Sequence, residues 1–264
     1  MEVRGKRVWV TGASSGIGAA LAVAFAEAGA RVVLSARRQA ELEQVAERCG
    51  DDSLVVTLDV TDQASIDAAV QRVNDAWGGV DILVNNAGIT QRSRATETDM
   101  TVYRRLLEVN LFGTIALTSA MLPGMLERGE GQIVCMSSIA GKVGAPLRTG
   151  YCAAKHAVVG YSDALRAEVQ DHGVHVLVVC PGFVNTPISY AALKGDGQAH
   201  GSMDADQAAG VPPETVASRT LQAINRGEHE ILVGGKEILA AHLKRISPRL
   251  LARLTRRVAA QRSR

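Results

Sequence analysis

The chain has 264 residues, of which 47% are hydrophobic and 3% aromatic, and its formal net charge is +2. This length suits a single α/β domain, and the aliphatic content is ample for a sheet that is covered on both faces. We expect no signal peptide, because strand-like residues begin at Lys6, and no membrane-spanning run, because none has the expected length. The sequence also argues against a metal site or a redox pair, because no cysteines have C-x-x-C spacing. We therefore expect reduced core cysteines in a cytoplasmic protein (Cys49, Cys135, Cys152 and Cys180).

Strand-like and helix-like segments alternate along the chain. Aliphatic runs predict seven strands: Val8–Val10, Arg31–Ala36, Ser53–Leu58, Ile82–Asn85, Ile133–Met136, Val174–Cys180 and Glu230–Val233. Helical segments are expected between them: Ile17–Glu27, Gln39–Arg48, Gln63–Trp77, about Asp99–Leu126, Tyr151–Gln170 and Pro213–Asn225. This alternation indicates a doubly wound α/β fold, in which a parallel sheet carries helices on both faces and the crossovers are right-handed.

One internal segment breaks the alternation. Residues 189–211 are rich in Gly, Ala and Asp, with little periodicity, and a loop of this length inside a compact domain is usually functional or mobile. We therefore expect one domain over residues 1–235, with 189–211 as a lid over a substrate site, and a separate tail over residues 236–264.

A glycine-rich turn follows the first strand directly: Thr11-Gly12-Ala13-Ser14-Ser15-Gly16-Ile17-Gly18. Glycines let backbone NH groups approach a pyrophosphate, and the start of a helix supplies unpaired donors and the positive end of the helix dipole. The position of the turn between a strand and a helix favours a dinucleotide site over a turn without a ligand.

The Gly-x3-Gly-x-Gly spacing of this turn resembles the short-chain dehydrogenase/reductase family. Further motifs of that family follow in its order along nearly the whole domain: Asn85-Asn86-Ala87-Gly88, Asn110, Ser138, Tyr151-x3-Lys155 and Pro181-Gly182. The resemblance implies a Rossmann-type fold and hydride transfer between a nicotinamide cofactor and a carbonyl or alcohol. It also implies a homodimer or homotetramer that packs through its long helices.

The end of the second strand predicts which nicotinamide cofactor is used. An NAD site would place an acidic residue there, whereas this strand ends Ala36-Arg37-Arg38. A guanidinium can hold the 2′-phosphate of NADP with two hydrogen bonds, so we predict NADP(H), bound through Arg37. Arg38 either assists or only solvates the following helix, and Ser14 and Ser15 could add hydroxyl donors.

Other cofactor contacts are implied by the resemblance alone. Asp59 would bond the adenine amino group, with the backbone of Val60 beside it. The Val184 backbone and the Thr186 hydroxyl would hold the carboxamide and so fix the hydride face. The resemblance extends these contacts to the remaining motif residues: Gly12, Gly16, Ile17, Gly18, Asn86, Ala87, Gly88, Tyr151, Lys155, Pro181 and Gly182.

The predicted chemistry centres on Tyr151, which shares a helix face with Lys155 four residues later. A free phenol has a pKa of about 10, and a neighbouring ammonium lowers it towards neutral pH, so Tyr151 is expected to act as the acid/base. Ser138, just after the fifth strand, can hydrogen-bond the same substrate oxygen. The alternation of strand side chains turns Ser137 the other way.

Expectations also follow for four further residues: Asn110, Lys155, His156 and Cys152. By resemblance Asn110 supports a water chain to the lysine, and Lys155 bonds the nicotinamide ribose. His156 lies about 140° around the helix from Tyr151, so a general-base role for it is rejected. Cys152 faces elsewhere and is expected to contribute packing.

The C-terminal tail has its own character. From Lys236 onwards it carries nine Lys/Arg and one acid, an excess of +8, so the rest of the chain carries −6 (20 bases and 26 acids). Its apolar residues have helical spacing, with a break at Pro248. The tail is either a membrane-surface helix or a structural arm, and the absence of Trp and Phe favours the arm. Nucleic-acid binding is not expected, because no aromatic residues accompany the arginines.

Two other functions compete with the oxidoreductase. A non-catalytic dinucleotide sensor or scaffold would keep the glycine turn but lose the acid/base group, which is intact here. Epimerases or dehydratases of the same fold usually have a larger C-terminal region. The absence of arginine between Ile188 and Val211 argues against a phosphorylated or carboxylated substrate. Arg92, Arg94 and Arg148, near the catalytic segments, keep such a substrate possible.

Overall fold

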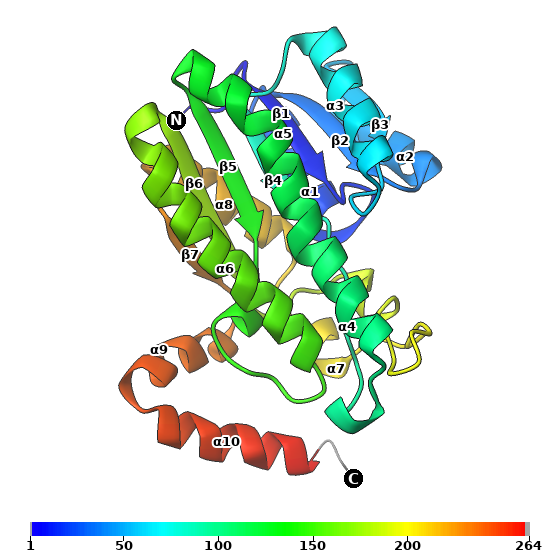
Figure 1. The fold of residues 1–264 in the computed structure, drawn as a ribbon, viewed down its shortest axis with the longest axis vertical. Helices are drawn as coiled ribbons and strands as arrows, with labels where there is room; N and C mark the ends of the chain where they lie inside the picture. Colours follow the sequence, from blue (N-terminus) through cyan, green and yellow to red (C-terminus); the bar gives the residue numbers. More distant parts are fainter. Residues whose placement is uncertain (1, 262–264) are drawn as a thin grey trace.

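The computed structural model describes residues 2–261, which contain a seven-stranded, wholly parallel sheet in the order β3-β2-β1-β4-β5-β6-β7 (Figure 1). All seven predicted strands are present, with ends that differ from the prediction by at most two residues. Their bounds are β1 Arg7–Thr11, β2 Arg31–Ala36, β3 Ser53–Thr57, β4 Ile82–Asn85, β5 Gly131–Met136, β6 Val174–Pro181 and β7 Glu230–Val233. The doubly wound α/β fold is confirmed.

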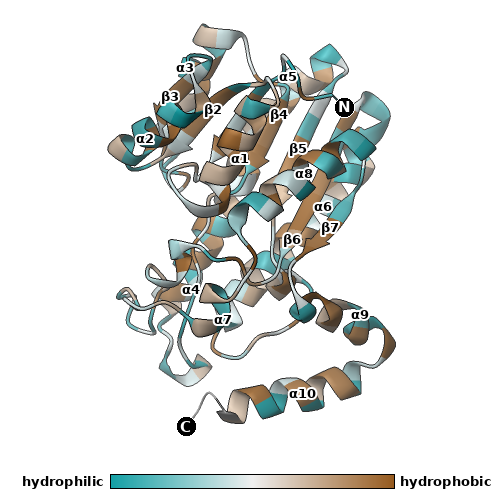
Figure 2. Ribbon diagram, turned by 180° about the vertical axis from the view of Figure 1, so that it is seen from behind, coloured by the Kyte–Doolittle hydropathy of each residue, from teal (hydrophilic) through white to brown (hydrophobic). Residues whose placement is uncertain are grey.

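Helices cover both faces of the sheet. The helices are α1 Gly16–Glu27, α2 Gln39–Cys49, α3 Gln63–Trp77, α4 Met100–Leu107, α5 Gly113–Arg128, α6 Thr149–Val169, α7 Ala205–Ala208, α8 Pro213–Arg226, α9 Leu239–Ile246 and α10 Pro248–Gln261. One face of the sheet packs against α1, α2 and α8, and the other against α3, α5 and α6 (Figures 1 and 2).

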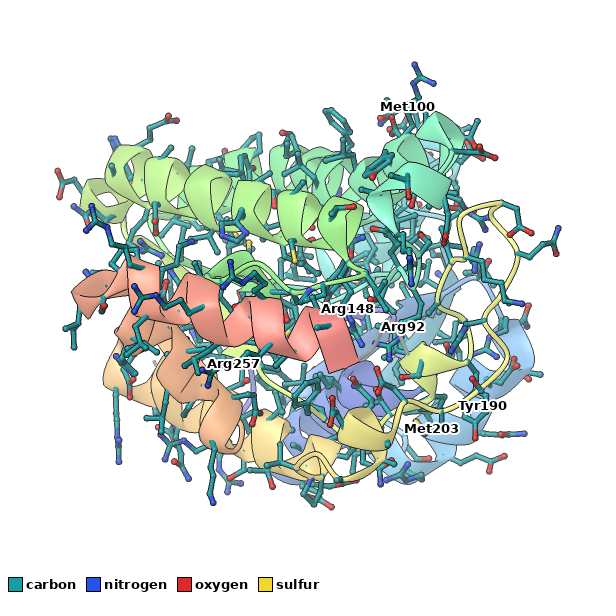
Figure 3. The ribbon with its side chains drawn as sticks, turned by 90° about the horizontal axis from the view of Figure 1, so that it is seen from below. Arg92, Met100, Arg148, Tyr190, Met203 and Arg257 are labelled. Carbon is teal, nitrogen blue, oxygen red and sulfur yellow. The ribbon has the colours of Figure 1, made fainter. Side chains whose placement is uncertain are left out.

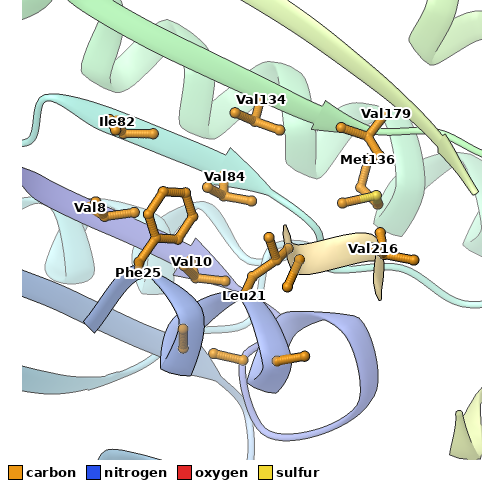
Figure 4. Close-up of a cluster of buried hydrophobic side chains, with 14 of the residues drawn as sticks. Val8, Val10, Leu21, Phe25, Ile82, Val84, Val134, Met136, Val179 and Val216 are labelled. Atoms are coloured by element: carbon orange, nitrogen blue, oxygen red, sulfur yellow. The ribbon is translucent and has the colours of Figure 1, made fainter. Parts of the chain in front are cut away.

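Each face has its own core of aliphatic side chains. On the α1 side, Leu21 and Phe25 are fully buried against residues of β1, β4 and β5 (Figure 4). On the other side, Trp9 packs with Leu117 and Met125 of α5. Strands with buried residues on both faces are characteristic of parallel sheets, which explains the continuous aliphatic runs in the sequence.

The order of the strands locates a crevice. The chain proceeds outwards from β1 to β3, then returns to pair β4 with the other side of β1. The connections after β1 and β4 therefore diverge at the carboxyl edge of the sheet, which is where α/β proteins of this topology bind ligands. The glycine-rich turn follows β1 at this edge, and Asn86-Ala87-Gly88 follows β4.

The long helical stretch is present, with one feature that the sequence did not predict. It runs without a break from Met100 to Arg128 and includes a π-helical turn, Glu108–Phe112, between α4 and α5. We expected no run that could cross a bilayer. By length and composition alone this expectation is wrong, because the helix from Met100 to Arg128 is long and apolar enough to do so. The face of α5 that includes Met121 and Met125 is buried in the core of the domain, so we interpret this segment as a core helix.

The tail forms two helices that meet at Pro248, as predicted: α9 before the proline and α10 from it. Lys244 of α9 donates a hydrogen bond from Nζ to the carbonyl of Lys142, at 2.7 Å, which holds α9 against the domain. α10 packs on α9 and extends beneath the body of the molecule (Figures 1 and 2). The predicted tail continues to Arg264, beyond the described residues.

Candidate active site

Hydrogen bonds join the start of the glycine-rich turn to the turn after β4. Thr11 Oγ1 accepts hydrogen bonds from the backbone NH groups of Asn86 and Ala87, at 2.9 and 3.0 Å. Asn86 Nδ2 returns a bond to the carbonyl of Thr11, at 2.9 Å. Gly18 allows the close approach, because a Cβ there would come within 2.1 Å of the Gly12 carbonyl oxygen. The turns after β1 and β4 are therefore one rigid unit.

Two adjoining cavities contain all the predicted site residues. A cleft of about 810 Å³ is lined by the phosphate turn and the ends of β2, β3 and β4. A smaller cavity of about 140 Å³ lies next to it and is lined by the predicted catalytic residues. Both cavities share the residues at their junction, namely Ile17, Asn86, Gly88, Thr186 and Ile188. A long ligand in the cleft would reach the smaller cavity at this junction.

The far end of the cleft is positively charged. Arg37 and Arg38 line it, and Arg38 also contacts Ser14 Oγ at 3.3 Å and Glu41 at 3.1 Å. Burial alone would raise the pKa of Asp59, but hydrogen bonds from Thr61 and the charges of Arg37 and Arg105 bring it below its ordinary value. Arg105 of α4 also lines this cleft, and the sequence did not indicate it.

The segment after β6 is fixed by a residue of the tail. Glu237 Oε1 accepts hydrogen bonds from the backbone NH groups of Phe183 and Gly235, each at 2.9 Å. A Cβ at Gly182 would come within 2.0 Å of the same oxygen, so glycine is required there to admit the carboxylate. Val184 and Thr186 follow directly and line the smaller cavity, so Glu237 acts on the predicted carboxamide site through the backbone.

Tyr151 lies in the smaller cavity and is 8% exposed. The pKa of Tyr151 is raised above its ordinary value because burial disfavours the phenolate, while a hydrogen bond with Ser138 and the charge of Arg148 oppose this shift. Ser138 and Tyr151 line the same cavity, as a shared contact with one substrate oxygen would require, and the phenol is in its protonated form at neutral pH.

Lys155 lies one turn further along α6. Its Nζ donates to the carbonyl of Met136 at 2.9 Å and lies 5.8 Å from the centroid of the Tyr151 ring. Burial lowers the pKa of Lys155 to about 8. The expectation that the ammonium brings the pKa of Tyr151 down is wrong for these side chains, because desolvation of the phenolate outweighs the stabilising interactions.

Asn110 is buried rather than on a helix surface. It occupies the π-helical turn, and its Nδ2 donates to the carbonyls of Leu106 and Ile89, at 2.8 and 3.0 Å. Its Oδ1 has no hydrogen-bond partner among the described residues. A Cβ on Gly88 would lie 2.7 Å from that oxygen and 3.4 Å from Lys155 Nζ. The orphaned oxygen and the ammonium therefore face the same small space, where a ligand or water could bridge them.

Three residues to which no catalytic role was assigned contact other parts of the protein. Ser137 donates from Oγ to the carbonyl of Lys155, at 2.9 Å, and so points away from the phenol. His156 contacts the carbonyl of Cys152 through Nδ1, and its other ring nitrogen faces Lys244 of the tail. Cys152 is buried against Ala145.

The predicted lid has two anchors on the site. Asp204, whose side chain is 8% exposed, accepts ion pairs at Oδ2 from Arg92 at 2.6 Å and from Arg148 at 3.0 Å. Gln207 of α7 donates to the carbonyl of Val184 at 2.5 Å. Arg148 also lines the cavity of Tyr151. Arg92 and Arg148 lie side by side next to the lid when the molecule is seen from below (Figure 3).

Known proteins resemble the chain over most of its length. Residues 6–196 match the family model described as short chain dehydrogenase. A dehydrogenase/reductase SDR family protein 7-like of Anopheles gambiae is 43% identical over 256 residues, which cover 94% of this chain and 81% of the relative. A solved short chain dehydrogenase/reductase from Burkholderia phymatum, in complex with NAD, has a TM-score of 0.83 at 27% identity, covering 95% of this chain and 96% of that one.

A second solved structure is similar to the same degree. The 3-ketoacyl-(acyl-carrier-protein) reductase from Brucella melitensis, complexed with NADH, has a TM-score of 0.80 at 28% identity and covers 89% of this chain and 99% of that one. Together with the matched sheet, these relationships show that the chain belongs to the short-chain dehydrogenase/reductase family of oxidoreductases, which bind a nicotinamide dinucleotide.

Proposed function

We propose that the protein is an NADP(H)-dependent oxidoreductase that transfers a hydride between the nicotinamide and a carbonyl or secondary alcohol, with Tyr151 as its general acid/base. The observation that carries this proposal is the position of Tyr151. Together with Ser138, it lines a cavity that adjoins the dinucleotide cleft. The bound cofactor supplies the hydride.

The residues of the cleft suit a dinucleotide. A Cβ at Gly12 would lie 2.9 Å from the Ala87 backbone, and one at Gly16 would lie 3.1 Å from Thr186, so glycines keep the cradle open. The cradle leads into the N-terminus of α1, where unpaired NH groups favour a phosphate. At the other end, Arg37, Arg38 and Arg105 supply cations for a 2′-phosphate, which supports NADP(H).

The protonation states favour carbonyl reduction. With its pKa raised by burial, Tyr151 is protonated and can donate to the substrate oxygen as negative charge develops there. Ser138 can hydrogen-bond the same oxygen. Lys155 and Asn110 are positioned to hold the ribose and a proton-relaying water beside Gly88.

The test is an NADPH-oxidation screen over ketones, aldehydes and quinones, with NADH as the control and Tyr151→Phe as the matched variant. We expect turnover with NADPH by the native chain and a loss of at least about a thousandfold in kcat for the variant, with NADPH binding retained. Appreciable turnover by Tyr151→Phe would contradict the proposed role of Tyr151. NADPH binding without turnover of any carbonyl would favour the sensor or scaffold instead.

We also propose a cytoplasmic location and a homodimer or homotetramer. The described cysteines are all free thiols, which is compatible with a reducing compartment. The exposed Met100 and Phe112 belong to the long helical stretch through which assembly was predicted. Light scattering on Phe112→Ser tests the assembly, because a lower mass for the variant is expected if this surface is the interface.

A further inference from the structure

Helix α10 exposes a row of apolar side chains. Leu250, Leu254 and Val258 lie at intervals of four residues on one face and are 44%, 41% and 40% exposed. Ile246, at the end of α9, is 84% exposed and lies next to this row in the chain. Single exposed apolar residues are ordinary, but three along one helix, with a fourth at the end of the preceding helix, form a patch that needs a partner.

The domain does not cover this patch. Leu251, Thr255 and Ala259 are the half-buried residues of α10, and they form a row about 100° further round the helix, next to the exposed row. α10 packs mainly on α9. The helix therefore has an inner side that is partly packed and an outer apolar side that remains available.

Basic residues adjoin the apolar row. At about 100° per residue, Arg253 and Arg257 lie within about 60° of Leu250 on one side of the row, and Arg249 and Arg256 lie further round on that same side. No acidic residue occurs between Ile238 and the end of the chain. An apolar face beside a purely basic face is the pattern of helices that lie in a membrane interface.

The position of α10 in the molecule fits a flat partner. The longest axis of the molecule is vertical in Figure 1, and α10 lies at its lower end, roughly across that axis. Figure 3, seen from below, shows α10 in front of the body with Arg257 at its edge. A planar surface could therefore touch the helix along its length without meeting the sheet.

We propose that α10, together with Ile246, docks on an anionic lipid bilayer surface. The charge of the tail, +8 from Lys236 onwards, complements a dense negative surface, and the row of Leu250, Leu254 and Val258 would enter the boundary between headgroups and acyl chains. The six excess acids of residues 1–235 are spread over a whole domain, so another copy of the chain offers a less concentrated partner. The structural-arm interpretation of the tail then applies only to α9, which Lys244 attaches to the domain.

Co-sedimentation of the full chain with vesicles tests the proposal. The vesicles are phosphatidylcholine alone or phosphatidylcholine with phosphatidylserine. One variant carries Leu250→Gln, Leu254→Gln and Val258→Gln; a second carries Arg249→Gln, Arg253→Gln and Arg257→Gln. A matched control removes three exposed arginines elsewhere, Arg48→Gln, Arg72→Gln and Arg219→Gln. All of these side chains are exposed, so the variants are expected to fold.

We expect the native chain and the control to bind the anionic vesicles at low salt, and both tail variants to partition at least about tenfold less, since each arginine near an anionic surface contributes on the order of fivefold. Equal sedimentation of the native chain and the tail variants would overturn the proposal. A second result would also overturn it: the native chain binds neither vesicle type, and the leucine variant has a lower mass in solution than the native chain. The patch would then join two copies of the chain.

Discussion

The carboxylate of Glu237 accepts the backbone NH of Phe183 at 2.9 Å, across 54 residues of sequence. The bond ties the first turn of the C-terminal segment to the loop after β6, directly before Val184 and Thr186. It also explains why Gly182 and Gly234 lack side chains, because a Cβ at either position would lie within 2.5 Å of the same Oε1. The position of the proposed carboxamide site therefore depends on a residue outside every motif that the sequence offered.

Replacing Glu237 separates this positioning role from a general effect on stability. Glu237→Ala leaves the NH groups of Phe183 and Gly235 without their acceptor, and we expect KM for NADPH to rise about tenfold, since a hydrogen bond to a charged group contributes about 1.5–3 kcal/mol. Glu237→Gln keeps an acceptor oxygen and should restore most of the affinity. Glu168→Ala, at an exposed site on α6, is the control. Steady-state kinetics that show the same small change in all three variants would contradict the role.

Arg37 is expected to carry the preference for the phosphorylated cofactor. In Arg37→Ala we expect KM for NADPH to rise by roughly tenfold to a hundredfold, because a charge-assisted bidentate contact with the 2′-phosphate is lost, while KM for NADH stays within about twofold. Arg105→Ala should produce a smaller change in the same direction, because Arg105 approaches the same cleft from α4. The measurement is the ratio of kcat/KM for the two cofactors. Faster turnover of the native chain with NADH than with NADPH would refute the argument.

The lowered pKa of Lys155 predicts that cofactor binding depends on pH. Its pKa in the folded protein is about 8, below the ordinary lysine value of 10.5, so the ammonium is present at neutral pH and is lost as the pH rises through about 8. If the ammonium holds the nicotinamide ribose, NADPH affinity should be constant below that pH and should fall above it. Burial raises the pKa of Tyr151 and of Cys180, so neither group loses its proton near pH 8, where Lys155 does.

Fluorescence titration of NADPH between neutral and mildly alkaline pH measures this effect. Lys155→Gln should bind more weakly at neutral pH and lose the dependence. A native profile that stays flat through this range, or one that persists in Lys155→Gln, would show that another group controls binding.

The sequence predicted the parts of this molecule whose geometry is local. Seven strands could be located because buried parallel strands are continuously aliphatic. Tyr151 and Lys155 could be paired because residues four apart share a helix face. Ser138 was distinguished from Ser137 by the spacing of the family it resembles and by the alternation of side chains at the end of β5, and the structure turns Ser137 towards the Lys155 carbonyl.

Contacts between distant segments could not be predicted in this way. Glu237 reaches the site from an element far from any motif. Arg105 lies five residues before Asn110, but nothing in the sequence marks it as a residue of the cleft. The pKa of Tyr151 was misjudged for a related reason. The sequence shows the nearby cation but not the burial, and here desolvation outweighs the stabilising interactions. The π-helical turn that buries Asn110 has no sequence signature at all.

If residues 189–211 form the proposed lid, Asp204 is expected to control how it closes. Its Oδ2 receives both Arg92 and Arg148, and all three side chains are at least four-fifths buried, so Asp204→Ala leaves two poorly hydrated guanidinium groups facing one another. We expect the lid to open more often, which should raise the rate of tryptic cleavage after the exposed Lys194 and lower kcat/KM for the carbonyl substrate by about tenfold. NADPH affinity should change little, because Arg37 and the phosphate turn are untouched.

The matched control is Asp196→Ala. Asp196 is an exposed aspartate in the same segment, and it accepts a hydrogen bond from the NH of Gln198. If Asp204→Ala and Asp196→Ala are cleaved at the same rate and retain equal kcat/KM, the pair of arginines does not hold the lid. If the variant gains activity selectively towards substrates with a carboxylate, Asp204 instead competes with the substrate for Arg148.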